Sequence, residues 1–222
     1  MVRSQFRTRI KFCGLTRAGD VRLAAELGVD AVGLVFARQS RRRIDHAAAG
    51  SLREAAGPCV DVVALFMDTP TDEVRAAIAA ARPTLLQFHG SEDDAFCHQF
   101  DMPYFKGVGM GAAPLGGSEL RARWPNAAGF VLDGHAPGQP GGSGQRLDAS
   151  AIPGDLDRPW LLAGGLDADS VGDAVCNVRP WGVDVAGGIE LAPGIKDGGR
   201  MRRFVEAVRA ADLASHGSDR IG

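Results

Sequence analysis

Lys11-Phe12-Cys13-Gly14-Leu15-Thr16 is the stretch that begins to decide the fold of this 222-residue chain. The apolar residues of Ile10–Leu15 predict a strand, and the glycine inside the stretch predicts a turn at its end. Thr16 is a suitable N-cap for the following helix, which we expect to end at Gly28. Cys13 therefore stands where a strand gives way to a helix. Such a junction becomes a functional site if the rest of the chain gathers several of them together.

The same pattern recurs along the whole chain. Apolar runs alternate with helical patterns, such as the spacing of i, i+3, i+4 and i+7 within residues 74–81. Most runs are continuously apolar, as in parallel strands that are covered on both faces. We expect eight strands, at Ile10–Leu15, Ala31–Phe36, Asp61–Met67, Leu85–His89, Tyr104–Met110, Gly129–Asp133, Trp160–Ala163 and Gly182–Ala186.

Capping residues predict where other helices begin. Thr69 is expected to cap a helix that has Pro70 at its first position, and Asp167 is expected to open another. The apolar faces of this helix and of the last one are expected at Val171, Ala174, Val175 and Val178, and at Met201, Phe204, Val205 and Val208.

Repeated βα units build either an open, doubly wound sheet or a closed barrel. Eight strands in 222 residues favour the barrel, so we expect the α/β class with a single-domain (β/α)8 TIM barrel. The fifth βα unit is expected to be degenerate, because residues 112–117 look like a loop and only Glu119–Arg123 can form a short helix. We expect residues 1–222 to form one domain, with frayed ends at about 1–8 and 214–222.

The composition is ordinary for a globular protein, with 45% hydrophobic and 23% charged residues and a formal net charge of −2. This charge gives no electrostatic reason to expect binding to nucleic acid or to an anionic membrane. We see no signal peptide and no apolar run near the ~18 residues of a membrane span. The four cysteines form no CxxC pair, and the five histidines show no metal-ligand spacing. We therefore expect a reduced, cytoplasmic protein without a metal site.

In a (β/α)8 barrel the chemistry lies where the strands end and the βα loops begin. Cys13 has two interpretations there: a buried structural thiol, which is the default, or a base or nucleophile that needs its thiolate form. Asp133, at the end of a very apolar run, either caps a loop or faces the mouth of the barrel. The glycine-rich segment 137–144 is either a flexible loop or a lid over a ligand.

Two glycine pairs, Gly164-Gly165 and Gly187-Gly188, follow the expected seventh and eighth strands. These two loops often form the phosphate site of this fold, since glycine lets backbone N–H groups approach a phosphate. The two pairs together predict a phosphorylated ligand. Gln87 and His89 alternate along the expected fourth strand, so they share a face that is either the barrel interior or the site.

Several short motifs follow one another in a characteristic order. They are Lys-Phe-Cys-Gly-Leu-Thr (11–16), the stretch Gly33–Arg43, Gln-Phe-His-Gly (87–90), Leu132-Asp133, Gly141-Gly142-Ser143-Gly144, Leu162–Leu166, Gly182–Val185 and Pro193–Asp197. Singly these patterns are modest, but together they are specific. From about Arg9 to Asp212 the chain resembles the phosphoribosylanthranilate isomerase family, a family of (β/α)8 enzymes of tryptophan biosynthesis.

The resemblance implies an Amadori rearrangement, in which N-(5-phosphoribosyl)anthranilate becomes 1-(2-carboxyphenylamino)-1-deoxyribulose 5-phosphate. It assigns the general base, which takes the C2 proton, to Cys13. It assigns the general acid beside the ribose ring oxygen to Asp133. No cofactor is implied, because proton transfer alone performs this reaction.

The resemblance also implies the substrate contacts. Arg42 is expected to bind the anthranilate carboxylate, with a bidentate fork that suits such a group. The sugar phosphate is expected to lie on the backbone of Gly165, Gly187 and Gly188, and further ligand contacts are expected from His89 and Asp184. The partner is thus a small phosphorylated substrate, and we expect a monomer or a weak homodimer.

Two positions depart from the usual pattern of the family. Ala186 replaces a serine that often follows the aspartate of the last strand, so we expect weaker or differently arranged phosphate contacts. Arg41 stands where the family often has proline, which leaves open which arginine of residues 41–43 reaches the ligand.

Two other functions remain open from the sequence. The phosphosugar isomerase of histidine biosynthesis performs the same rearrangement on the same barrel, but it has aspartates in both the acid and the base positions, so Cys13 argues against it. A non-catalytic barrel that only binds phosphorylated ligands would keep the glycine loops without needing both Cys13 and Asp133. Turnover of the two candidate substrates distinguishes these functions.

Overall fold

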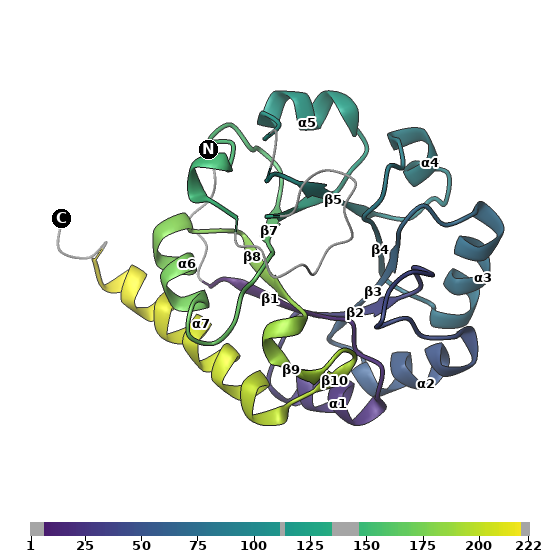
Figure 1. Ribbon diagram of the computed structural model, residues 1–222, viewed down its shortest axis with the longest axis horizontal. Coiled ribbons are helices and arrows are strands. Elements are labelled where there is room, and N and C mark those ends of the chain that lie inside the picture. Colours follow the sequence, from purple (N-terminus) through teal and green to yellow (C-terminus); the bar gives the residue numbers. More distant parts are fainter. Residues whose placement is uncertain (1–6, 112–113, 135–146, 219–222) are drawn as a thin grey trace.

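Eight parallel strands close into a barrel, and the helices surround it (Figure 1). The computed structural model describes residues 7–111, 114–134 and 147–218. The strands are Arg9–Cys13 (β1), Ala31–Val35 (β2), Asp61–Phe66 (β3), Leu85–Phe88 (β4), Tyr104–Gly109 (β5), Gly129–Asp133 (β6), Trp160–Leu162 (β7) and Gly182–Val185 (β8). A small antiparallel hairpin, Glu190–Ala192 (β9) and Ile195–Lys196 (β10), follows the barrel.

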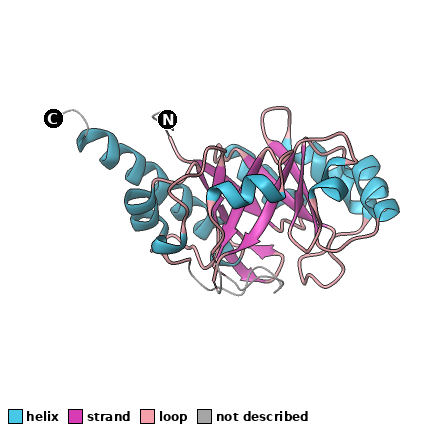
Figure 2. Cartoon of the chain, turned by 90° about the horizontal axis from the view of Figure 1, so that it is seen from above, coloured by secondary structure: helices cyan, strands magenta, loops and turns pink. Residues whose placement is uncertain are grey.

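Helices connect the strands and cover the outside of the barrel (Figure 2). They are Ala18–Glu26 (α1), His46–Ala56 (α2), Thr71–Ala81 (α3), Asp94–His98 (α4), Gly117–Arg123 (α5), Val171–Val178 (α6) and Gly198–Ser218 (α7), with 3-10 turns at Ala149–Ala151 (η1) and Gly187–Ile189 (η2). Both views show that α7 extends beyond the barrel toward the C-terminus.

The eight expected strands are all present, and closure of the sheet decides between the two folds left open. Strand β1 pairs with β2, where Cys13 lies opposite Gly33, and also with β8, where Lys11 lies opposite Asp184. An open sheet would leave two edge strands unpaired. Several strands end one or two residues earlier than expected. For β1 this is because Leu15 already belongs to the turn, although it is fully buried.

The main core lies between the outer face of the barrel and the helices. Strand side chains such as Phe12, Phe88 and Phe130 pack there against helix side chains such as Val74 and Phe204. The rings of Phe12 and Phe204 meet edge to face, with 5.9 Å between their centroids. A second, smaller apolar cluster fills the interior of the barrel from its inward-facing strand residues. The strands are therefore apolar on both faces, which explains their continuous apolar runs.

Three predicted helix starts are wrong. Thr16 does not cap α1, whose N-cap is Arg17, because the Thr16 hydroxyl donates to a carbonyl of the β9–β10 turn at 2.6 Å. Pro70 is the N-cap of α3 and not its first residue. Asp167 lies before α6 and holds the turn there, since its carboxylate accepts the N–H of Ser170 at 2.9 Å.

The folded part of the chain extends further toward both termini than expected. Thr8 is 6% exposed, and its N–H donates to the Asp212 carboxylate at 2.9 Å. Helix α7 continues through Ser218, beyond the expected start of fraying at residue 214. Residues 1–6 and 219–222 lie outside the described residues, as does the glycine-rich segment interpreted as a flexible loop or a lid.

Candidate active site

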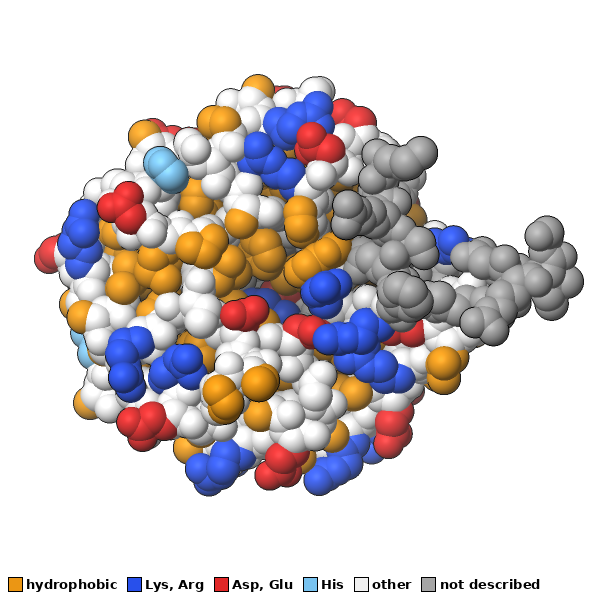
Figure 3. Space-filling model, turned by 180° about the vertical axis from the view of Figure 1, so that it is seen from behind, with side chains coloured by type: hydrophobic (Ala, Val, Ile, Leu, Met, Phe, Trp, Pro, Cys, Tyr) orange, Lys and Arg blue, Asp and Glu red, His pale blue; other side chains and the backbone are white. Residues whose placement is uncertain are grey.

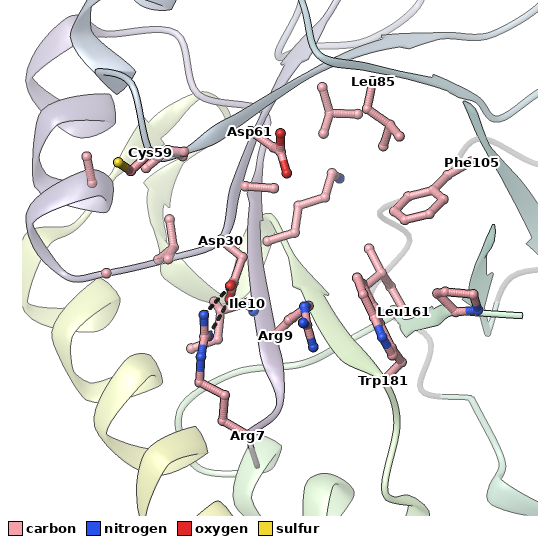
Figure 4. Close-up of a pocket in the computed structure, with 18 of the residues that line it drawn as sticks. Arg7, Arg9, Ile10, Asp30, Cys59, Asp61, Leu85, Phe105, Leu161 and Trp181 are labelled. Atoms are coloured by element: carbon pink, nitrogen blue, oxygen red, sulfur yellow. Dashed lines mark hydrogen bonds and ion pairs between the residues drawn. The ribbon is translucent and has the colours of Figure 1, made fainter. Parts of the chain in front are cut away.

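A large cavity opens at the amino-terminal end of the barrel. Its volume is about 560 Å³, and Phe105, Leu161 and Trp181 form apolar parts of its wall (Figure 4). The Arg9 guanidinium lies over the Trp181 ring, 4.5 Å from the ring centroid. Figure 3, the view from behind Figure 1, shows basic and acidic side chains close together among hydrophobic ones. This end of the barrel therefore has both a cavity and charged side chains.

The charged side chains at this cavity are paired with other groups of the protein. Arg7 donates two hydrogen bonds to Asp30, at 2.8 and 2.5 Å, drawn as dashed lines in Figure 4. Asp30 also accepts the N–H of Ile10 at 2.8 Å, and Asp61 accepts the hydroxyl of Thr84 at 2.8 Å. None of the predicted site residues lines the cavity. Since the amino-terminal end of such barrels serves stability, we place the candidate site at the opposite end.

Cys13 is the last residue of β1 and is only 7% exposed. Its thiol lies against Gly33 of β2, where an added Cβ would stand 2.8 Å from Sγ. Burial raises the pKa of the Cys13 thiol above its usual value, while the charges of Lys11 and Lys196 oppose that shift. A buried thiol beside two cations is a candidate proton acceptor.

Lys11 and Asp184 form an ion pair inside the barrel. The Lys11 ammonium donates to both carboxylate oxygens of Asp184, each at 2.9 Å, and the two side chains are 2% and 8% exposed. Lys11 precedes Cys13 by two residues on β1, so both side chains point to the same face of the strand. Burial works against its charge, yet Asp184 and Cys13 hold the pKa of Lys11 above its usual value. Lys11 is therefore a cation at the base of the site.

Lys196 on β10 joins three parts of the carboxyl end. Its ammonium donates to the carbonyl of Cys13 at 2.7 Å, to that of Ala186 at 3.0 Å and to Glu190 Oε1 at 2.8 Å. The Lys196 side chain is fully buried, and this burial lowers the pKa of its ammonium despite the neighbouring carboxylate. Burial disfavours the charge of Glu190 too, but hydrogen bonds from Arg42 and Lys196 hold the pKa of Glu190 below its usual value.

Arg42 reaches the end of β1 from the loop between β2 and α2. Its stem lies over Gly14, which has a φ of +71° and no room for a Cβ beside the Arg42 chain. Its Nε and Nη2 atoms donate to the two oxygens of Glu190 at 2.8 and 2.7 Å. Arg41 and Arg43 are exposed, whereas the Arg42 side chain is 18% exposed. Arg42 is thus the arginine of this run that points into the site.

Asp133 ends β6 at the same end of the barrel and is 5% exposed. It lies opposite Gly109 of β5, and its backbone carbonyl accepts the N–H of Met110 at 2.9 Å. Strands β7 and β8 separate β6 from β1. The carboxyl group and the Cys13 thiol therefore enter the mouth of the barrel from different sides.

Gln87 and His89 mark the β4 side of the mouth. The Gln87 amide nitrogen lies 3.3 Å from His89 Nδ1, and the His89 ring packs against Gly107 of β5. Gln87 is 1% exposed, and its Oε1 has no hydrogen-bond partner within the described part of the chain. A buried carbonyl oxygen without a donor costs about 1–3 kcal/mol. A hydroxyl group of a bound ligand could supply that donor.

The two glycine loops lie side by side. Gly165 has a φ of +59°, and a Cβ on Gly188 would collide with the carbonyl of Leu166. The loops after β7 and β8 can approach this closely only because Gly188 has no side chain. Gly187 is exposed at the start of η2, and Arg42 Nη2 lies 3.6 Å from where its Cβ would stand. Gly187, one of the three glycines expected to hold a phosphate, therefore lies next to the Arg42 guanidinium.

Within the described ranges, no group of three His, Cys, Asp or Glu side chains is placed to hold a metal ion. A membrane-spanning helix is likewise absent from those ranges, since no helix there is both long and apolar enough.

All predicted site residues that the sequence analysis named lie at the carboxyl ends of strands or in the loops that follow them. The three charged residues bound to or beside Cys13 and Arg42 had no predicted role: Lys11, Glu190 and Lys196. Their signal in the sequence is a charge in an apolar context. Lys11 stands in an otherwise apolar strand, and Glu190 and Lys196 flank an apolar hairpin. Only the fold shows that the hairpin packs onto the end of β1.

The chain is similar to known proteins over most of its length. Residues 10–207 match the family model of N-(5'phosphoribosyl)anthranilate (PRA) isomerase. A relative from Xanthomonas campestris pv. campestris, an N-(5'-phosphoribosyl)anthranilate isomerase, is 58% identical over 217 residues, which cover 96% of this chain and 98% of the relative.

Solved structures agree with this similarity. The phosphoribosyl anthranilate isomerase of Thermus thermophilus has 34% identity and a TM-score of 0.80, and the match covers 91% of this chain and 99% of that one. A second solved phosphoribosyl anthranilate isomerase has 27% identity and a TM-score of 0.76 over the same shares. It is in complex with reduced 1-(o-carboxyphenylamino)-1-deoxyribulose 5-phosphate.

Proposed function

The chain belongs to the N-(5'-phosphoribosyl)anthranilate isomerase family and is an isomerase of tryptophan biosynthesis, and we propose that Cys13 is its general base and Asp133 its general acid. The observation that supports these roles is the placement of a buried thiol and a buried carboxyl group at the ends of β1 and β6, on one end of the barrel. The resemblance of the surrounding motifs to those of the family supports the same roles.

The rearrangement is a series of proton transfers on the substrate, of which two begin it. In the first, Asp133 donates a proton to the ribose ring oxygen, the bond between C1 and that oxygen breaks, and the nitrogen lone pair forms the C1=N bond. In the second, the Cys13 thiolate takes the proton from C2, and the electrons of the C–H bond form C1=C2 while the C1=N electrons return to nitrogen. In the last step the Cys13 thiol returns a proton to C1 and the Asp133 carboxylate accepts the hydroxyl proton of the enol, which gives the aminoketose and restores both side chains. An acid and a base in separate surroundings suit this sequence.

Arg42 binds the anthranilate carboxylate in this proposal. A guanidinium is planar and forms two parallel hydrogen bonds to a carboxylate. The support is its position, because its stem crosses Gly14 beside Cys13 while Arg41 and Arg43 are exposed.

The sugar phosphate lies on the backbone of Gly165, Gly187 and Gly188 in this proposal. The close approach of the two glycine loops supports it. Because Ala186 has no hydroxyl group, backbone N–H groups are the donors there. His89 and Asp184 are proposed as further substrate contacts, although Asp184 is also held by Lys11.

Turnover by isosteric variants tests the two catalytic roles. We expect Cys13→Ser and Asp133→Asn each to lower kcat by about 10²- to 10⁴-fold, as removal of a general acid or base does. The measurement is loss of substrate fluorescence with freshly made N-(5-phosphoribosyl)anthranilate. Cys59→Ser is the matched control, because Cys59 is exposed and lines the amino-terminal cavity. The roles are wrong if either variant keeps wild-type turnover, and turnover of the histidine-pathway aminoaldose alone would favour the rival isomerase.

Other properties of the chain are proposed on less direct grounds. The four free cysteines support a reduced, cytoplasmic location. Large hydrophobic side chains exposed in the described ranges are few, Leu191, Ile195 and Leu213, which supports a monomer or a weak homodimer. Light scattering after gel filtration tests the oligomeric state. A degenerate fifth βα unit, within one domain spanning residues 1–222, is proposed from the sequence alone, because α5 with seven residues is longer than α4 with five.

A further inference from the structure

Glu190 has no role in the proton transfers, yet it accepts four hydrogen bonds from other groups of the protein. It is 5% exposed and accepts two hydrogen bonds from Arg42, at 2.8 and 2.7 Å. It also accepts one from Lys196 at 2.8 Å and one from the N–H of Gly194 at 3.0 Å. Both of its oxygens accept hydrogen bonds from groups of the protein. A carboxylate bound in this way has little freedom to move.

The contact with Glu190 uses only one edge of the Arg42 guanidinium. A guanidinium has five N–H donors in one plane. Glu190 takes the edge formed by Nε and Nη2. The Nη1 atom has no hydrogen-bond partner among the described residues, so the edge formed by Nη1 and Nη2 is available to a second carboxylate. Because the group is rigid and planar, holding one edge fixes the direction of the other.

The charges of this cluster add up to a site for an anion. Arg42 and Lys196 are cationic and Glu190 is anionic, so the three side chains together have one net positive charge. Glu190 alone would neutralise Arg42, and its attraction for a substrate carboxylate would be weak. Lys196 offsets the charge of Glu190, which leaves that of Arg42 in excess.

The cluster is also anchored to the strands that bear the proposed catalytic groups. Lys196 donates to the backbone carbonyls of Cys13 and Ala186, at the ends of β1 and β8. The position of the guanidinium is therefore set relative to the Cys13 thiol. A bound carboxylate would place the rest of the substrate in a fixed relation to that thiol.

We propose that Glu190, supported by Lys196, is a positioning residue that directs the free edge of Arg42 at the anthranilate carboxylate. It thereby makes the enzyme specific for carboxylated aromatic amines. This inference rests on the proposed role of Arg42.

A comparison of two substrates tests it. One is N-(5-phosphoribosyl)anthranilate, and the other is the analogue made from aniline, which lacks the carboxylate. We expect Glu190→Gln to raise KM for the carboxylated substrate about ten-fold, within the range for hydrogen bonds to charged groups, with kcat changed less than about two-fold. For the aniline analogue we expect kcat/KM to be unchanged. Arg42→Ala should likewise raise KM for the carboxylated substrate and leave kcat/KM for the aniline analogue unchanged.

Glu73→Gln is the matched control. Glu73 pairs with Arg38, an exposed arginine of the same loop. This variant removes an arginine–glutamate contact of the same kind, and we expect it to leave KM for both substrates at the wild-type value.

Each outcome decides between distinct explanations. If Glu190→Gln lowers kcat/KM equally for both substrates, the role of Glu190 is merely structural and the inference is overturned. If Arg42→Ala lowers kcat/KM equally for both substrates, the proposed role of Arg42 is overturned instead. If Arg42→Ala lowers kcat/KM only for the carboxylated substrate while Glu190→Gln leaves kcat/KM unchanged for both substrates, the inference alone is overturned. Should Glu190→Gln fail to fold, Glu190→Asp keeps the charge beside Lys196 but withdraws the carboxylate from Arg42, and it gives the same comparison.

Discussion

The Cys13 thiol is subject to two opposed influences. Burial favours the neutral thiol, because a low dielectric disfavours the charged form. The neighbouring Lys11 and Lys196 favour the thiolate. Burial is the larger influence, so the pKa of Cys13 is raised. At neutral pH the thiolate that the proposed chemistry needs is therefore the minor form.

Alkylation of Cys13 tests this balance. Only the thiolate reacts, and the thiolate fraction rises about ten-fold per pH unit below the pKa. We therefore expect the rate of Cys13 modification by iodoacetamide to rise steadily with pH from 6 to 9 without reaching a plateau. Mass spectrometry resolves Cys13 from the exposed Cys59, which serves as the internal control for the reagent. A plateau near pH 7 would show that the lysines, and not burial, dominate.

At the scale of the elements, the strands could be predicted more fully than their connections. All eight strands were predicted, since a buried strand shows as an apolar run whatever lies beside it. The predicted helix starts at Thr16, Pro70 and Asp167 were wrong, because a capping residue has other partners available. Thr16 binds the β9–β10 turn, which is distant in sequence. The positions of Cys13 and Asp133 at strand ends were predicted, whereas the Glu190–Lys196 pairing was not.

The two glycine loops give a prediction at this scale. A Cβ on Gly188 would collide with the Leu166 carbonyl, so Gly188→Ala must push apart the loops after β7 and β8. We expect KM for the phosphorylated substrate to rise by about ten-fold, as loss of one charge-assisted contact does. Steady-state kinetics measure it.

Gly172→Ala is the control for that variant. Gly172 lies in α6, where an added Cβ would be 3.9 Å from the nearest atom, the carbonyl of Ala207. We expect its KM to match the wild type and its stability to be equal or up to about 1 kcal/mol higher, since alanine favours the helix. Equal KM values for Gly188→Ala and Gly172→Ala would contradict a role of the loop contact in phosphate binding.

At the scale of the whole molecule, closure joins the two ends of the chain. The first strand pairs with the last strand of the barrel, and α7 packs beside both α6 and α1. Just before β1, Thr8 donates its N–H and its hydroxyl to the Asp212 carboxylate of α7, at 2.9 and 2.6 Å. Thr8 and Asp212 are 204 residues apart in sequence. This contact fixes the start of β1 on the final helix.

Asp212→Ala tests how much that contact stabilises the fold. The variant leaves the Thr8 N–H and hydroxyl buried without their acceptor, which costs about 1–3 kcal/mol for each unsatisfied group. We expect the free energy of unfolding in urea to fall by about 2–6 kcal/mol, with kcat unchanged because the contact lies at the amino-terminal end. A loss below about 0.5 kcal/mol, the usual effect of a surface substitution, would contradict a role in closure.

The sequence by itself determined the class of fold, the eight strands of the barrel and the residues that stand at their ends. It did so because burial on both faces of a strand and the conformational needs of turns are recorded locally, in apolar runs and glycines. The motifs around Cys13, Asp133 and the glycine pairs also identified the family. Only the tertiary structure decided that Arg42 is the arginine turned inward and that Glu190, which is itself bound by Lys196, holds it. These contacts join residues nearly 150 positions apart, from Arg42 to Glu190, and such pairings depend on how the barrel closes and where the hairpin after β8 packs.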